Sequence, residues 1–248
     1  MGNKTIMRND TSCLLYDHKN ALLFLFLLIS AFVAISIVAF AHAEETSEVH
    51  TSGDFQYVIL DEKGKTGSIY KYSGDNTVIE IPDHIAGISI IRIENEAFSG
   101  CTSLQSIAVP NGVMSIGSKA FWGCSSLQSI TLPDSLISIG TYAFTFCYLL
   151  NNITIPESVT SIGYNAFEQC TSLESIAIPE SVTCIKSWTF KDCNSLSSIT
   201  LPNSLTSIED YAFWGCTSLK DIMIPSNVTF IGNSAFEACS SLDRKSVV

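Results

Sequence analysis

The chain has 248 residues, of which 46% are hydrophobic and 15% are charged, and its formal net charge is −11 at pH 7. This composition indicates a folded protein and not a disordered one. Nucleic acids and anionic lipids attract clustered Lys and Arg, so an acidic chain of this kind is not expected to bind nucleic acid or to adhere to a lipid surface.

Residues 21–40 form one uncharged apolar run, and basic residues precede it. Ala41, His42 and Ala43 follow in a small-x-small pattern that suits signal peptidase, so residues 1–43 are predicted to be a cleaved signal peptide. The run is also long enough to cross about 30 Å of hydrocarbon, and an uncleaved signal anchor is the alternative, with this segment as the chain's one membrane contact. In both cases the basic residues before the apolar run predict that the chain after residue 43 is secreted or held at the cell surface.

The next two stretches are predicted to be a linker and a cap. Residues 44–54 are polar and lack apolar periodicity, which is typical of a linker. Residues 55–81 contain three strand-like runs, FQYVIL, SIYKY and TVIEIP, separated by polar turns with glycine. We expect a small antiparallel β cap here, because the end of a stacked array would otherwise expose its apolar interior and an unpaired strand edge.

From residue 82 to residue 242 the sequence repeats with a period of 23. A period of 20 to 29 residues is typical of leucine-rich repeats. Columns of leucine, isoleucine and proline keep the same register as an aromatic column. The aromatic column is Phe98, Phe121, Phe144, Phe167, Phe190, Phe213 and Phe236.

Each repeat contains an L-x-x-I-x-I-P run whose alternation predicts a strand with one buried face, closed by proline. A second short extended piece follows, and the A-F-x-G-C-x-S-L segment is predicted to return the chain through helical turns. Stacked repeats then give a solenoid: a leucine-rich-repeat arc with one parallel sheet and short second strands, β-dominated within the α/β class. Gly117, Gly140, Gly163 and Gly232 are expected to take positive φ.

The repeat unit C-x-S-L-x-x-I-x-I-P-x-S-V-x-x-I-G-x-x-A-F resembles the BspA-like leucine-rich repeat of exported bacterial and protozoan surface proteins. The resemblance covers residues 77–242. It implies a secreted or surface-displayed binding protein whose role is adhesion to host proteins, matrix or neighbouring cells. It brings no catalytic residues.

A cysteine recurs once per repeat, but stacked positions direct their Cβ atoms in parallel, which is poor geometry for a disulfide. We expect buried free thiols instead. Beyond residue 43, His50 and His84 are the only histidines, too few for a zinc cluster, and no hydrolase, metalloprotease, phosphate-loop or dinucleotide motif occurs. The sequence therefore predicts no enzyme activity, no cofactor and no metal.

Two sets of variable positions are candidate partner-binding residues. Outward positions of the predicted strands form a smooth hydroxyl-rich face, which equally suits a protein or glycan ligand and an ordinary sheet surface. Aromatic residues flanking the A-F segment are either interface anchors or a cover for the core. The candidates are Ser129, Thr131, Asn152, Thr154, Ser198, Thr200, Trp122, Tyr142, Trp188, Tyr211 and Trp214.

Residues 243–248, DRKSVV, depart from the repeat register. They are either a frayed terminus or a truncation artefact, because the translation of a common sequencing-library adapter gives the same six residues. The chain is thus predicted to be an exported, non-enzymatic protein-binding or adhesion module. The alternative is a structural spacer or stalk of a larger surface protein whose carboxyl-terminal enzymatic or anchoring domain is lost.

Overall fold

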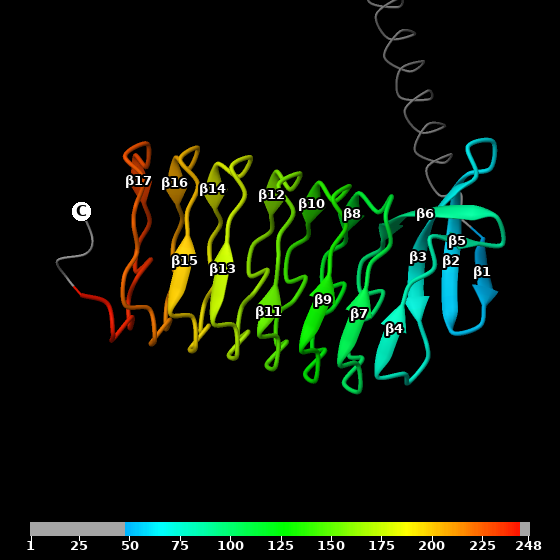
Figure 1. Ribbon diagram of the computed structural model, residues 1–248, viewed down its shortest axis with the longest axis horizontal. Helices are drawn as coiled ribbons and strands as arrows, with labels where there is room; N and C mark the ends of the chain where they lie inside the picture. Colours follow the sequence, from blue (N-terminus) through cyan, green and yellow to red (C-terminus); the bar gives the residue numbers. More distant parts are fainter. Residues whose placement is uncertain (1–47, 244–248) are drawn as a thin grey trace, which may run out of the picture. The chain divides into compact units, whose positions relative to one another are not determined.

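The structure is a computed structural model that describes residues 48–243. The chain winds into successive coils, one per 23-residue repeat, that stack side by side along one axis (Figure 1). Residues 1–43 and 244–248, which carry the predicted signal and most of the predicted tail, lie outside the described residues. Within residues 48–243, no helix combines the length and apolar character needed to cross a bilayer.

The amino-terminal strands are antiparallel, as the sequence predicts for the cap. Strand β1 (Val49–Ser52) pairs with β2 (Phe55–Asp61), which pairs in turn with β3 (Thr66–Tyr72). Strand β1 lies inside the predicted linker, so the linker prediction is wrong for these residues. The reason is pairing, since β1 gains backbone hydrogen bonds along β2 and the His50 ring lies 5.3 Å from that of Tyr57.

The third predicted cap strand belongs to the stack instead. Strand β4 (Val78–Glu80) pairs in parallel with the first strand of the following coil. The cap joins the stack through β3, which pairs in parallel with β6 (Ile88–Ile93), and the short β5 (His84–Ile85) pairs antiparallel with β6.

Two columns of short parallel strands run along the stack. After β4, the first column contains β7 (Ser106–Ala108), β9 (Ser129–Thr131), β11 (Asn152–Ile153), β13 (Ser175–Ala177) and β15 (Ser198–Thr200). After β6, the second column contains β8 (Ser115–Ile116), β10 (Ser138–Ile139), β12 (Ser161–Ile162), β14 (Cys184–Ile185), β16 (Ser207–Ile208) and β17 (Phe230–Ile231). After β4, which pairs with residues 28 further on, paired residues in these columns are 23 apart, for example Ser106 and Ser129, so the pairing register equals the sequence period.

The A-F segments form a third column, which we call the turn column, and it contains no helix in the described part of the chain. The predicted helical turns are therefore wrong. In each coil the residues two before and two after the phenylalanine take positive φ, as Lys119 at 55° and Gly123 at 70° do around Phe121. Left-handed residues at this spacing stop a helix. They turn the backbone toward the next coil, where the Phe121 N–H donates to the Ala143 carbonyl at 2.8 Å.

The glycines predicted to have positive φ do not have it, because their role is a close approach. Gly117, Gly140, Gly163 and Gly232 are absent from the positive-φ residues. A Cβ on Gly140 would lie 2.5 Å from the Gly117 carbonyl carbon, and one on Gly163 would overlap Gly140 in the same way. Glycine at these positions lets the backbones of neighbouring coils pack directly on one another.

Both strand columns are interrupted at one junction, so the predicted single sheet is divided. The first column breaks between β11 and β13, and the second between β12 and β14. Lys186 occupies the glycine position at this junction, bends back over the Tyr164 ring at 5.3 Å and lies 3.5 Å from Ser161 Oγ. Glu209 also replaces this glycine, yet its N–H still donates to the Ile185 carbonyl. The placement of the Lys186 side chain between the coils therefore accompanies the break.

The core is an uninterrupted ring column flanked by leucine and isoleucine. Phe98 and the five phenylalanines that follow it at 23-residue intervals are fully buried, and neighbouring rings stack with centroids 5.2 to 5.5 Å apart. Tyr72 extends the column into the cap, with its ring 5.4 Å from that of Phe98. Stacked aromatic pairs contribute about 0.5–1.5 kcal/mol each beyond their area, so the column ties each coil to the next.

Candidate binding surfaces

The interior of the solenoid is filled with side chains, so functional groups lie on its surface. Among residues 48–243, no group of three or more His, Cys, Asp or Glu side chains is placed to hold a metal ion. The shifted pKa values in the described part of the chain belong to the cysteines and to Asp192.

The cysteine column is one of free thiols, as predicted. Cys124, Cys147, Cys170, Cys193 and Cys216 are fully buried, while Cys101 and Cys239 are half-buried. Each thiol from Cys124 onward donates to the carbonyl oxygen of the phenylalanine 26 residues earlier, at 3.1 to 3.2 Å. Burial raises the pKa of every thiol in the column, to about 12 for Cys124. These cysteines are structural donors, a role that the sequence does not reveal.

Cys184 lies outside this column, and its surroundings are unsuited to a reactive thiolate. It is half-buried in β14 and its thiol donates to Glu209 Oε1 at 3.3 Å. Burial and this hydrogen bond to Glu209 raise its pKa, although Ser207 opposes the shift. A thiol of raised pKa holds its proton at neutral pH and is a poor nucleophile.

A groove crosses the outward face of the first strand column. It consists of two neighbouring depressions, of about 640 Å³ and about 270 Å³, that share Thr131. Ser129, Thr131, Asn152 and Thr154 line the smaller one, so the structure brings these four predicted residues together. Ser198 and Thr200 are exposed on β15 and do not line it.

Acidic residues line the same groove, and the strand pattern alone missed them. Glu80, Asp83 and Asp134 are exposed at its wall. Asp83 and Asp134 each follow the proline that ends a first-column strand. The signal that could have found Asp83 and Asp134 is therefore the post-proline column, which reads Asp83, Asn111, Asp134, Glu157, Glu180, Asn203 and Ser226. Glu80 lies instead at the strand position that pairs with Ala108.

The predicted aromatic residues lie along the turn column but do not form one continuous strip. Trp122 is exposed and meets Phe146 edge to face, with centroids 5.5 Å apart. Tyr142 is exposed and has φ of 58°. The second group is separate, since Asn165 occupies the position between Tyr142 and Trp188 in this column.

Trp188, Tyr211 and Trp214 are half-buried and belong to a packed cluster. The Trp188 and Tyr211 rings stack at 4.1 Å with an angle of 9° between their planes. The Lys191 ammonium lies 5.0 Å from the Trp188 centroid and 5.8 Å from that of Trp214. These side chains support one another, so they cover the core as well as presenting a surface.

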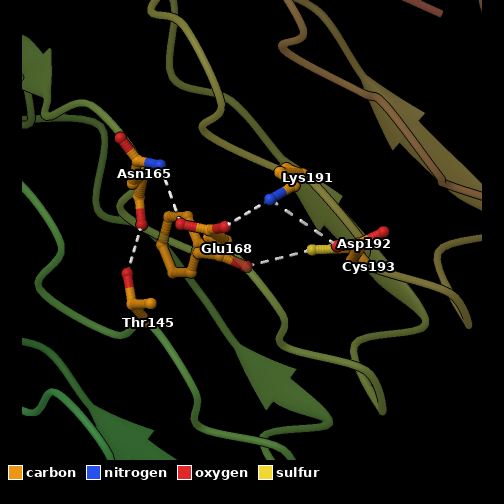
Figure 2. Close-up of polar contacts among 7 residues, drawn as sticks. Thr145, Asn165, Glu168, Lys191, Asp192 and Cys193 are labelled. Atoms are coloured by element: carbon orange, nitrogen blue, oxygen red, sulfur yellow. Dashed lines mark hydrogen bonds and ion pairs between the residues drawn. The ribbon is translucent and has the colours of Figure 1, made fainter. Parts of the chain in front are cut away.

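Figure 2 shows the polar network behind this aromatic cluster. Lys191 Nζ lies 2.9 Å from Glu168 Oε1 and 3.9 Å from Asp192 Oδ2. Asn165 Nδ2 donates to the other Glu168 oxygen at 2.7 Å, and Thr145 Oγ1 donates to the Asn165 carbonyl. Burial raises the pKa of Asp192, and Lys191 opposes that shift. The network crosses the junction at which the two strand columns are interrupted.

Comparison with known proteins identifies the repeat. A family model described as the BspA type leucine rich repeat region, in 6 copies, matches residues 67–183 and 160–247. The chain belongs to the BspA-type leucine-rich repeat family. The predicted family is thus confirmed, and a BspA-type repeat array is a protein-interaction module. A search among curated proteins found no match.

Two crystal structures share this fold at substantial identity. A leucine rich cell surface protein from Faecalibacterium prausnitzii is 38% identical over 79% of this chain and 53% of that protein, with a TM-score of 0.73. A leucine-rich repeat protein from T. pallidum is 34% identical over 80% of this chain and 92% of that protein, with a TM-score of 0.75. The chain therefore spans about half the length of the Faecalibacterium protein. These likenesses confirm the predicted BspA-type solenoid.

Proposed function

We propose that the chain is an exported, non-enzymatic module that binds another protein in adhesion at the cell surface. The observation that carries this proposal is the groove over β4, β7, β9 and β11, which presents hydroxyl, amide and carboxylate side chains on the outward face of the strands. The BspA-type family and the cell-surface description of the Faecalibacterium protein support it. So does the signal-like pattern of residues 1–43, which we propose delivers the repeats outside the cytoplasm.

Binding fits this face better than catalysis does. Its lining combines hydroxyl, amide and carboxylate groups at the surface of paired strands, with Ile130 and Val109 buried beneath. Catalytic acids and bases are usually recognised by strongly shifted pKa values in a water-excluding cleft. This groove is instead an open sheet face, which suits recognition of another surface.

Immobilised collagen, fibronectin and laminin test this proposal by interferometry with the purified chain. We expect saturable binding of at least one of them, and weakening when Thr131→Trp fills the shared part of the groove. Thr102→Trp is the matched control, because Thr102 is exposed outside the groove. Its binding should equal that of the unmodified chain. Absence of saturable binding to all three proteins would overturn the proposal in favour of a spacer.

A further inference from the structure

We propose that the groove over β4, β7, β9 and β11 binds an extended Lys- or Arg-rich segment of a partner protein. The inference rests on the proposed binding function and names its partner class. Three features of the groove carry it: its length, its unpaired negative charge and the hydroxyl and amide groups on its floor.

The length of the groove matches a short extended peptide. Both depressions are lined by Thr131, so they adjoin each other, and together their lining residues come from four neighbouring strands. Strands lie about 4.8 Å apart, which makes three spacings about 14 Å long, and an extended chain advances about 3.3 Å per residue. Four to five residues of a partner therefore fit along it.

The carboxylates in the groove are free to meet a cation. Glu80 and Asp134 make no side-chain hydrogen bond or ion pair with any residue in the range 48–243, and Asp83 Oδ1 lies 3.2 Å from His84 Nδ1. No Lys or Arg lines either depression. The unpaired carboxylates of Glu80 and Asp134, one in each depression, give the groove a negative potential that attracts a basic segment.

Other acidic residues of the post-proline column accept hydrogen bonds from the backbone of the next coil. Glu157 Oε2 accepts from the Glu180 N–H at 3.4 Å, and Glu180 Oε1 accepts from the Asn203 N–H at 3.3 Å. These carboxylates tie one coil to the next. Glu80 and Asp134 have no such bond, so their charge is available to a ligand.

The position of the groove also decides how a peptide lies. Strands β7 and β9 have a partner on each side, so a peptide cannot join them as an extra strand and lies across their outward face. Side chains of Thr131 and Asn152 can then donate to or accept from its backbone, and the Ser129 hydroxyl, which donates to Ser106 Oγ, can accept from it. No aromatic residue lines either depression, so the stacking platform that often recognises sugars is missing, and a basic peptide fits better than a glycan.

A fluorescein-labelled hexapeptide of alternating Lys and Arg, and its Gln analogue, test the inference by fluorescence polarisation with the full chain. We expect the basic peptide to bind and the Gln analogue not to. The double variant Glu80→Gln/Asp134→Asn should bind the basic peptide about tenfold more weakly, since each solvent-facing ion pair raises the affinity severalfold. Thr131→Lys places a cation between the depressions and should weaken binding at least as much. Raising the salt concentration should weaken it too.

The matched control is Glu62→Gln/Glu237→Gln, which removes the same charge from two exposed acids outside the groove. It should leave the basic peptide's affinity unchanged. Equal weakening by both double variants would mean that net charge attracts the peptide, and the groove inference would fail. Circular dichroism melting curves establish that each variant is folded.

The two proposals fail in different ways. Binding of a matrix protein that Thr131→Trp weakens, together with no binding of the basic peptide, overturns the inference of a basic partner segment and leaves the proposed function standing. Absence of binding by both the peptide and the three matrix proteins overturns the proposed function itself.

Discussion

The Cys193 thiol donates a hydrogen bond to the Phe167 carbonyl oxygen at 3.1 Å, across the junction at which both strand columns are interrupted (Figure 2). The Phe167 carbonyl also accepts from the Cys170 N–H, so it bonds within its own coil and to the next. Cysteine suits this place because its side chain is small, apolar enough to be buried and still a donor. The cysteine column therefore adds a set of bonds between coils.

Replacing Cys147 tests this role at an uninterrupted junction. Cys147→Ala removes the donor to the Phe121 carbonyl and leaves a small cavity, so we expect a loss of about 1–2 kcal/mol in the free energy of unfolding. Cys147→Ser keeps a donor and should lose less. Urea denaturation measures both, and the half-exposed Cys184→Ser should change stability by less than about 0.5 kcal/mol. Equal losses for Ala and Ser would contradict the hydrogen-bond role.

Alkaline pH should destabilise the protein. The fold raises the thiol pKa from its ordinary value near 9 to about 12 for Cys124 and about 11 for Cys239. The contribution of such a thiol is fully present below its unfolded pKa and is lost as pH rises toward the folded one. Each fully buried thiol should remove about 1.4 kcal/mol of stability per pH unit above about pH 9. Urea midpoints at pH 8, 9 and 10 measure this.

A double variant separates the thiols from the other groups that titrate above pH 9. Cys124→Ala/Cys147→Ala lacks two of the buried thiols, so its stability should fall less steeply with pH by about 2.8 kcal/mol per unit. Both proteins contain the same Tyr and Lys residues. Identical slopes would show that the thiols do not cause the alkaline loss.

Removing the Lys186 side chain should close the interrupted strand columns. With glycine at this position the coil can approach Gly163 as Gly163 approaches Gly140. We expect slower hydrogen exchange of the amides at positions 183 and 186 in Lys186→Gly, because they gain partners in the preceding coil. Glu209→Gly is the control, since the junction there is already paired. It should give no added protection, and unchanged exchange in Lys186→Gly would refute the explanation.

The Lys191–Glu168 pair should show strong coupling. Lys191→Met keeps the apolar stem over Trp188 but leaves the mostly buried Glu168 carboxylate without its cation, so a loss of about 1–3 kcal/mol is expected. Glu168→Gln in that background removes the unpaired charge and should recover part of the loss. A double-mutant cycle by urea denaturation measures the coupling. Additive effects would mean that the pair contributes nothing beyond its separate parts.

The period of 23 was enough to predict the solenoid, its two kinds of strand and its buried phenylalanine column. Those features depend on apolar spacing, which is local and repeated. The backbone conformation of the turn column was harder to predict, because residues as different as Lys119, Tyr142 and Trp188 share one left-handed position. No residue type marks such a place, and its conformation is imposed by the bonds to the next coil.

In the candidate surfaces, too, the exposure of single residues could be predicted from the sequence, but the contacts between coils could not. Exposure of Thr131 and Thr154 follows from strand alternation, whereas the groove depends on how the proline turns of neighbouring coils leave space beside them. The sequence identified the aromatic residues but did not reveal which of them contact one another. Trp188 and Tyr211 stack on each other, so truncating either one changes folding and binding together. Trp122, at 38% exposed, is the better probe of a turn-column interface.

The even spacing of the phenylalanine rings makes the coils interchangeable. The Phe121–Phe144 and Phe190–Phe213 pairs both have centroids 5.3 Å apart. If one 23-residue segment were deleted or duplicated, the flanking coils would meet through an interface of the same kind. Recombination between repeats in the gene can therefore lengthen or shorten the molecule in steps of about 5 Å. The length of the array can change without any redesign of its core.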